Sequence, residues 1–275
     1  MTPADDHVAI LGRGRLGSSL ARALEAAAVE VVLVPARDED AVATAVAGAG
    51  IVLLAVPDGA IRATAARVLA VAGAHRPAVA HLSGALGDAE LAALAHAGFA
   101  VGSLHPYLPF PQVREPDAFT GGTVGVHGST PELEARLAGL ARRLGAVPRP
   151  VDEAHRVRYH AAAVMASGYV VALAAQAAGL LEGLGWSREE ALAALLPLMR
   201  GAVDALEDSG LPDGLSGPLR RGDTGTVARH LEALRAGAPP LTVETYAVLC
   251  RSALALAVEA GLDPRVAAEV EALLG

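Results

Sequence analysis

Lysine is absent from the 275 residues, so all 22 basic residues are arginine. Chemistry that needs a lysine side chain, such as a Schiff base or a lysine general acid, is therefore excluded. Cysteine occurs once, at Cys250, so no internal disulfide can form, which is typical of a reducing compartment. The first residues also lack the cationic and apolar segments of a signal peptide, and we expect a cytoplasmic protein.

Aromatic residues make up only 3% of the chain, and no basic run interrupts its net charge of −8. A nucleic acid would need a cationic surface, so we expect no nucleic-acid partner. The hydrophobic residues are mostly Ala, Val and Leu, a composition typical of helices packed on a buried parallel sheet.

Residues 161–181 are uncharged and long enough to cross a membrane. They include Ser167, Tyr169 and Gln176, which favours a buried central helix over a membrane span.

Short apolar runs alternate with helical patterns up to Pro150. The runs are expected to be strands and lie within residues 7–12, 29–34, 51–57, 77–83, 99–104 and 123–128. This alternation predicts an α/β fold with a doubly wound, mostly parallel sheet of the Rossmann type. After Pro150 only helical patterns remain, the first from about residue 152 to 183. We therefore expect a dinucleotide-binding domain over residues 1–151 and an all-helical, substrate-binding domain over residues 152–275.

A glycine motif, G-x-G-x-x-G, connects the first predicted strand to a helical stripe. In this context the first glycine permits a tight turn, the second lets backbone amides approach a pyrophosphate, and the third lets helix and strand pack closely. A glycine-rich turn that binds nothing is the alternative. We assign cofactor contacts to Gly12, Arg13, Gly14, Arg15, Leu16 and Gly17.

The end of the second predicted strand bears on the choice of cofactor. NAD enzymes usually have a carboxylate there, but this strand ends in Val34-Pro35-Ala36 and is followed by Arg37. Together with the arginines of the glycine motif, Arg37 favours NADP (NADPH) over NAD. A shift of one residue would instead make Asp38 the ribose-binding carboxylate.

The third predicted strand is followed by Val56, Pro57 and Asp58. We expect Val56 and Pro57 to contact the cofactor, Pro57 beside the nicotinamide ribose. Asp58 is expected to cap the next helix.

Two more strands are expected to end at the same edge, with Ser83 after one and His105 after the other. A hydroxyl and an imidazole there can reach one carbonyl and move its proton, and His160, on the first long helix, is a further candidate. We assign catalysis to His105, His160 and Ser83. The alternatives are a turn role for Ser83, a histidine fixed by Pro106 for His105, and a buried histidine for His160.

Four residues are assigned to the substrate. Ser167 lies two turns after His160 on the same face, and the loop SGPLRRGDTGT supplies Ser216 and the adjacent arginines, which can hold a carboxylate with paired hydrogen bonds. The substrate contacts are therefore expected from Ser167, Ser216, Arg220 and Arg221. For Arg221 a plain surface charge is the alternative, and Asp223 is expected to cap a helix. No metal is predicted, because His155 and His160 have no partner at ligand spacing.

The motifs GRGRLG, VPDGAI, HLSGALG, GSLHPYLPF, RYHAAAVMASGY and LSGPLRRGDTGTVARHLEAL resemble a bacterial family. That family joins a Rossmann-like domain to a helical domain of unknown function. Its domain plan is similar to that of prephenate dehydrogenases, ketopantoate reductases, pyrroline-carboxylate reductases and coenzyme-F420-linked NADP oxidoreductases. The resemblance implies a catalytic role for the His-Pro pair at His105 and a homodimer formed through the helical domain. Relatives that rely on a lysine in the first interdomain helix have no equivalent here, and His160 is the nearest counterpart.

These features predict an NADP-dependent oxidoreductase that transfers a hydride between NADPH and a small carbonyl or imine substrate bearing a carboxylate. A 2-oxo acid such as ketopantoate, or a cyclic imino acid, fits the paired arginines. The proton donor is expected to be His105, because an unperturbed imidazole titrates near neutrality. The alternative is a non-catalytic NADPH-binding sensor whose helical domain binds a partner protein.

Overall fold

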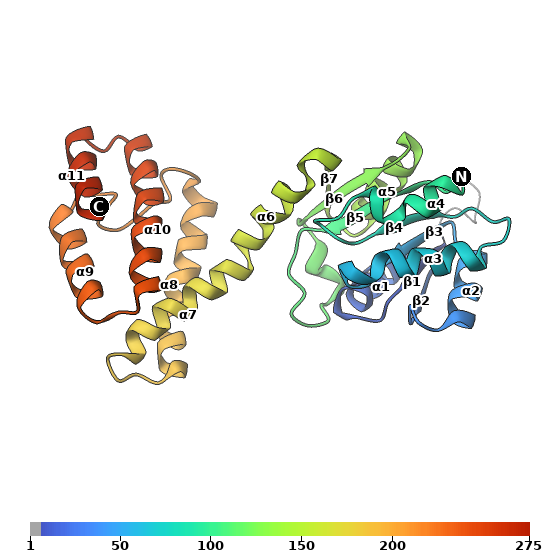
Figure 1. Ribbon diagram of the computed structural model, residues 1–275, viewed down its shortest axis with the longest axis horizontal. Helices are drawn as coiled ribbons and strands as arrows, with labels where there is room; N and C mark the ends of the chain where they lie inside the picture. The colour runs from blue at the N-terminus through green and yellow to red at the C-terminus, as the bar shows by residue number, and fades with distance from the viewer. Residues whose placement is uncertain (1–6) are drawn as a thin grey trace. The chain divides into compact units, whose positions relative to one another are not determined.

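The computed structural model describes residues 7–275. Residues 1–6, on which the signal-peptide expectation depends in part, lie outside the described residues. The chain divides into two compact units, residues 1–167 and 168–275. The first contains the sheet and its helices, and the second is helical (Figure 1).

Seven strands form one sheet in the order β2-β1-β3-β4-β5-β6-β7. β1 to β5 are parallel, β6 is antiparallel to β5, and β7 is parallel to β6. This confirms the predicted mostly parallel α/β fold. The strands are β1 (Val8–Leu11), β2 (Val31–Val34), β3 (Ile51–Leu54), β4 (Ala78–His81), β5 (Val101–Pro106), β6 (Thr123–Gly128) and β7 (Val147–Pro150).

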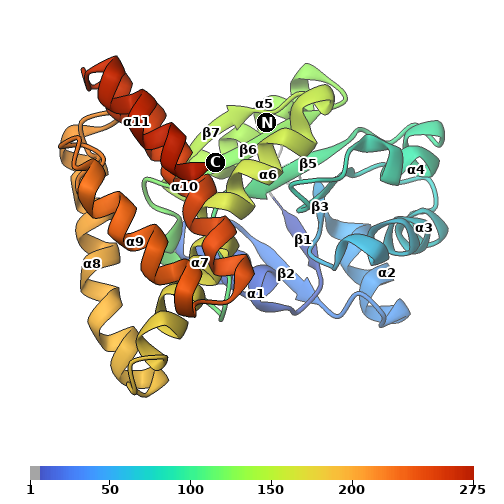
Figure 2. The same ribbon diagram turned by 60° about the vertical axis from the view of Figure 1, so that its left-hand side comes forward.

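Helices cover both faces of the sheet, which is why the strands are apolar without alternation (Figure 2). In β1, Val8 and Ile10 pack on the side of α1 and α5, whereas Ala9 and Leu11 pack on the side of α2, α3 and α4. The helices of this unit are α1 (Arg15–Ala26), α2 (Glu39–Gly48), α3 (Ile61–Val71), α4 (Ala92–His96), α5 (Pro131–Arg143) and α6 (Arg156–Ala166).

The strand order places a topological switch point between β1 and β3. The chain leaves β1 toward β2 on one side and returns past it to β3 on the other. In open α/β sheets, ligands bind in the crevice outside the carboxyl ends of the strands at such a point. The glycine motif directly follows β1 and therefore lies there.

The strand β7 was not expected from the sequence. Its four residues, VPRP, include Pro148 and Pro150, which lack the N–H that a central strand donates. The strand pairs only with β6, at the end of the sheet, where an edge position tolerates proline.

The single long helix expected from residue 152 to 183 is wrong, because the structure breaks it at Ser167. There φ is −126° and ψ is −80°, and the Ser167 hydroxyl donates to the carbonyl of Ala163. A hydroxyl that binds the preceding turn competes with helical hydrogen bonding, and Gly168 next to it is permissive. Since α6 belongs to the first unit, the units divide one short helix later than the predicted boundary at 151/152.

The second unit contains α7 (Gly168–Glu182), α8 (Arg188–Ser209), α9 (Thr224–Gly237), α10 (Pro240–Glu259) and α11 (Pro264–Leu274). Ser187 and Glu190 form the expected capping box of α8, and the Asp223 carboxylate caps α9 by accepting the N–H of Thr226. A small core joins α9, α10 and α11, with Val227 and Val270 fully buried.

The expectation that residues 161–181 form a buried helix is wrong for the single chain. Two helical segments are long and apolar enough to cross a membrane, residues 153–182 and 240–259, but only 6% and 17% of their apolar windows are buried. Large apolar side chains such as Val171 and Leu198 are about 70% exposed, at 71% and 72%. The helical unit by itself therefore leaves much of its apolar side-chain surface uncovered.

Candidate active site

The glycine motif folds into the turn for which its glycines are needed. Gly12 has a φ of +130°, and a Cβ there would lie 2.1 Å from the carbonyl oxygen of Ala55. A Cβ on Gly17 would lie 2.0 Å from the carbonyl oxygen of Gly12. Both glycines are therefore required to bring the strand β3, the turn and the helix α1 together.

Gly14 has a different surrounding, because a Cβ on it would meet no atom within 4 Å. It is the N-cap of α1, where no side chain caps the first amides and no acidic residue occupies the first turn. The N-terminus of a helix attracts anions through its free N–H groups and its dipole. This turn thus fits a pyrophosphate, while the side chain of Leu16 packs on the core, so that only its backbone faces the turn.

Two arginines of the predicted cofactor site, Arg13 and Arg37, lie near the end of β2. Arg13 donates to the carbonyl of Leu33 at 3.3 Å, and Arg37 is exposed, with no hydrogen bond or ion pair among residues 7–275. Asp38 caps α2 by accepting the N–H of Ala41, so its carboxylate is engaged in the helix start. This arrangement favours the cationic interpretation of the turn over a ribose-binding Asp38.

Arg67 is a cation that the sequence analysis did not identify. It lies on α3, and its guanidinium donates to the carbonyl of Ala36 at 3.4 Å, in the same turn as Arg37. Because Arg67 lies 31 residues after Ala36, no local sequence pattern indicated that it would reach this turn. Arg15, by contrast, is directed to another segment, where it donates to the carbonyl of Pro111 at 2.8 Å.

Val56 and Pro57 follow β3 at the carboxyl edge of the sheet, and Pro57 is exposed. Asp58 begins a short 3-10 turn, Asp58–Ala60, whose N-cap is Pro57 and which has no side-chain cap hydrogen bond. The expected capping role of Asp58 is therefore wrong.

His105 lies near the end of β5 and pairs with Tyr159 of α6. Its Nδ1 is 2.9 Å from the Tyr159 hydroxyl, and the two rings meet edge to face with their centroids 5.5 Å apart. Tyr159 fits because its neighbour on β6 is a glycine: a Cβ on Gly125 would lie 2.6 Å from the phenolic oxygen. Gly125 is the register partner of His105, which is why the phenol lies directly beside the imidazole. The sequence analysis did not identify Tyr159 as a site residue.

The rings of His105 and His160 lie 5.9 Å apart at the loop after β4. A Cβ on Gly84 would lie 2.6 Å from Cε1 of His105 and 2.7 Å from Cδ2 of His160. The loop after β4, the strand β5 and the helix α6 therefore converge at one point, which brings His105 and His160 together as expected, with Ser83 preceding Gly84 in the loop. The Ser83 hydroxyl accepts the N–H groups of Ala85 and Leu86, which is the alternative turn role.

Burial lowers the pKa of His105 to about 4, with further contributions from His160, Arg156 and His81. At neutral pH the imidazole is therefore uncharged, and the argument that it titrates near neutrality is wrong. Burial also raises the pKa of Tyr159, which keeps its hydroxyl protonated. The pair consists of a neutral imidazole and a neutral phenol.

A row of polar side chains crosses the sheet two residues before His105 on β5. His81, Ser103 and His127 are register partners across β4, β5 and β6, so they lie on one face of the sheet. The guanidinium of Arg156, only 2% exposed, donates to the Ser103 hydroxyl at 2.6 Å. Since Arg156 contacts Ser103 and Tyr159 contacts His105 two residues later, the start of α6 is held along β5.

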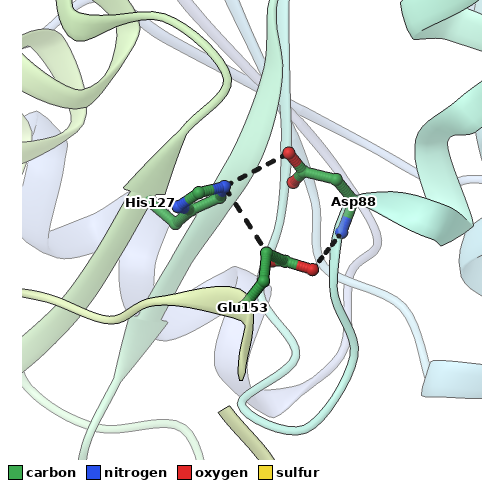
Figure 3. Close-up of side chains that lie close together, drawn as sticks. All are labelled: Asp88, His127 and Glu153. Carbon is green, nitrogen blue, oxygen red and sulfur yellow. Dashed lines mark hydrogen bonds and ion pairs between the residues drawn. The ribbon is translucent and has the colours of Figure 1, made fainter. Parts of the chain in front are cut away.

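His127 meets two carboxylates that are distant in the sequence, those of Asp88 and Glu153 (Figure 3). Its Nε2 lies 3.2 Å from Asp88 and 3.9 Å from Glu153, and Glu153 also accepts the backbone N–H of Asp88. A metal ion could use these three ligand types, and the sequence spacing gave no sign of the cluster. Glu153 also forms an ion pair with the buried Arg156 at 3.3 Å, so this carboxylate already has a positively charged partner within the chain.

The predicted substrate residues lie elsewhere in the chain, at the end of α6 and in the helical unit. The Ser167 hydroxyl is bonded to Ala163, and Arg220 forms an ion pair with Asp213 at 3.7 Å. Ser216 and Arg221 are exposed, and neither side chain forms a hydrogen bond or ion pair among the described residues, although the Arg221 backbone N–H donates to the carbonyl of Pro218. Arg221 is thus the arginine available for an anion.

The helical unit also contains an apolar cavity of about 390 Å³ between α7, α9 and α10. Among the lining residues, Gln176 has a buried Oε1 without a hydrogen-bond partner, and His230 is bonded to the Tyr246 hydroxyl at 2.9 Å. None of the predicted substrate residues lines it.

A parallel sheet with a glycine turn at its switch point, followed by an all-helical unit, defines a Rossmann-type two-unit protein. Residues 123–253 match the family model described as Domain of unknown function (DUF2520). This match confirms the resemblance found in the sequence motifs. No curated protein sequence matches the chain.

Solved structures share the fold. A proposed NADP oxidoreductase from Bacteroides fragilis aligns with a TM-score of 0.68 and 21% identity, over 92% of this chain and 100% of its own. The protein TM1727 from Thermotoga maritima aligns with a TM-score of 0.67 and 21% identity, over 90% of this chain and 98% of its own. Pyrroline carboxylate reductase from Plasmodium falciparum, solved with NADP bound, aligns with a TM-score of 0.61 and 15% identity, over 98% of each chain.

Proposed function

We propose that the protein is an NADP-dependent oxidoreductase that transfers a hydride between NADPH and a small carbonyl or imine substrate bearing a carboxylate. The observation that carries the proposal is the meeting of His105 and His160 at Gly84, on the sheet edge that also bears the glycine turn. The likeness to reductases that bind NADP supports the same class. A non-catalytic sensor would need no proton-bearing groups at this edge, so the paired histidines favour the enzyme.

The residues of the turn and of its surroundings fit NADPH. The N-terminus of α1 at Gly14 would hold the pyrophosphate, and Arg13, Arg37 and Arg67 would hold the 2′-phosphate. When bound, the nicotinamide supplies the hydride.

His105 acts on the substrate as a neutral hydrogen-bond donor. Reduction of a carbonyl forms a C–H bond at carbon and moves the electron pair of the C=O π bond to oxygen, where negative charge develops. A donor aimed at this oxygen stabilises that charge, and a proton must then reach the oxygen. His160 or water donates this proton, since His105 is uncharged.

Cofactor titration tests the proposal first. NADPH fluorescence should show binding about ten- to a hundredfold tighter than that of NADH, because a charge-assisted phosphate contact contributes about 1.5–3 kcal/mol. Equal affinities would overturn the preference for NADP, and binding of neither cofactor would overturn the function. Ketopantoate and a cyclic imino acid are the first substrates for an NADPH oxidation assay.

Replacing His105 tests the assigned chemistry. On a confirmed substrate His105→Asn should lower turnover by about 10²–10³, the loss expected when one donor to a developing oxyanion is removed, and leave NADPH affinity unchanged. If His105→Asn and His160→Asn both retain full turnover, the roles of the histidines are wrong.

We also propose that the exposed apolar face of the helical unit is covered by a second copy of the chain. Soluble proteins rarely leave so many large apolar side chains exposed on neighbouring helices. Sedimentation should show a dimer, and Val171→Glu should yield monomers, whereas Val113→Glu, in the sheet-bearing unit, should not. A monomeric wild-type chain, or a chain that floats with liposomes, would overturn the dimer.

A further inference from the structure

The hydrogen bond between Tyr159 and Nδ1 of His105 decides which of the two ring nitrogens of His105 carries the proton. Nδ1 of His105 is 2.9 Å from the Tyr159 oxygen, and no other hydrogen bond joins the His105 ring to the described residues. A neutral imidazole has one N–H and one acceptor nitrogen, so the partner of Nδ1 decides the tautomer.

The direction of this hydrogen bond follows from the surroundings of the phenol. If Nδ1 carried the proton and donated it, the hydroxyl proton of Tyr159 would need another acceptor. Among residues 7–275 the hydroxyl has no such acceptor, and Gly125 lies directly against it. A half-buried donor without a partner costs about 1–3 kcal/mol, so Tyr159 donates and Nδ1 accepts.

The other nitrogen, Nε2, then carries the proton and faces the loop after β4. A Cβ on Gly84 would lie 2.7 Å from Nε2 of His105 and equally close to the ring of His160. Four groups face the pair formed by His105 and Tyr159. They are Arg156 and His160 on α6, Tyr107 directly after β5, and His81 on β4. Arg156 is occupied by Ser103 and Glu153, so none of these groups replaces Tyr159 at Nδ1.

We propose that Tyr159 is the positioning residue that holds His105 in the Nε2–H tautomer, so that His105 presents a hydrogen-bond donor at the sheet edge. With the opposite tautomer, an acceptor would face the substrate oxygen and repel its developing charge. The catalytic consequence rests on the proposed oxidoreductase function, whereas the tautomer is a property of the chain alone.

Nitrogen NMR of the histidine-labelled protein tests the tautomer without cofactor or substrate. The His105 signals, assigned through their loss in His105→Asn, should show the Nε2–H pattern at pH 7.5 in the full-length wild-type protein. In Tyr159→Phe they should show a mixture of both tautomers. Tyr107→Phe should keep the wild-type pattern, because the Tyr107 hydroxyl donates to the Tyr159 carbonyl and not to His105. A wild-type Nδ1–H pattern, or an unchanged pattern in Tyr159→Phe, would overturn the proposal.

A kinetic measurement then tests the consequence separately. On a confirmed substrate Tyr159→Phe should lower kcat about ten- to a hundredfold with little change in KM, a smaller loss than that of His105→Asn. An unchanged kcat together with a changed tautomer would overturn the catalytic role and keep the tautomer assignment. Absence of any NADPH binding would instead refute the oxidoreductase and leave the NMR result standing.

Discussion

Gly84→Ala should disrupt the point where the loop after β4, β5 and α6 meet. The new Cβ would lie 2.6 Å from Cε1 of His105 and 2.7 Å from Cδ2 of His160, and ordinary contact begins at 3.4 Å. The rings or the loop must therefore shift by about 0.8 Å, which disturbs the site that contains the 2.9 Å hydrogen bond between His105 and Tyr159. Overpacking of this kind costs about 1–3 kcal/mol.

Urea unfolding followed by circular dichroism measures this loss. Trp186, the single tryptophan, lies in the helical unit, so its fluorescence serves as an internal reference for that unit. Gly139→Ala on α5 is the matched control, because its Cβ would meet nothing within 4 Å, and it should be neutral or stabilise by about 0.5–1 kcal/mol. Turnover of Gly84→Ala should fall about a hundredfold. A Gly84→Ala protein as stable as the wild type would refute the convergence of the three elements at this glycine.

Three further predictions follow from the same geometry. Arg67→Gln should weaken NADPH binding about tenfold and leave NADH binding unchanged. The control is Arg62→Gln, on the same helix but paired with Glu90, which should alter the binding of neither cofactor. Equal loss of affinity for both cofactors in Arg67→Gln would exclude a 2′-phosphate contact. Burial, and next Arg156, lowers the pKa of His81 from 6.5 to about 4, so the contribution of this histidine to stability is complete above pH 6.5 and is lost as the pH falls toward 4. His81→Leu should remove up to about 3 kcal/mol of that pH dependence. An unchanged dependence of urea unfolding on pH would show that His81 is not buried as described. Elemental analysis should find no stoichiometric divalent metal in the cluster of His127, Asp88 and Glu153. Glu153→Gln should destabilise the protein by about 1–3 kcal/mol, because Arg156 loses its carboxylate partner. If a chelator lowers the stability of the wild-type protein, the cluster is instead a metal centre.

Much of the fold was predictable because its signals are local. Short, mostly apolar runs between helical stripes indicate strands covered on both faces, and the predicted runs overlap β1 to β6. The seventh, β7, was missed because Pro148 and Pro150 are acceptable only at an edge, and the edge exists only once the sheet is assembled. The break at Ser167 was missed for a related reason, since an apolar, small-residue pattern continues through it.

The candidate site was only partly predictable. Residues at or just beyond strand ends, such as Gly12, Ser83 and His105, could be placed at one edge because parallel strands end together. Tyr159 and Arg67 could not, because their partners lie 54 and 31 residues away and are reached from helices whose rotation depends on packing.

The sequence by itself therefore determined the α/β class, the glycine turn and the position of His105 near a strand end, because period, turn chemistry and helix capping are encoded within a few neighbouring residues. Only the tertiary structure decided that Asp38 caps a helix, that His105 is buried and neutral, and that Gly125 leaves room for Tyr159 beside it. Those properties depend on strand register and on how closely α6 packs against β5. Register and packing distance are set by the whole sheet, and no local spacing records them.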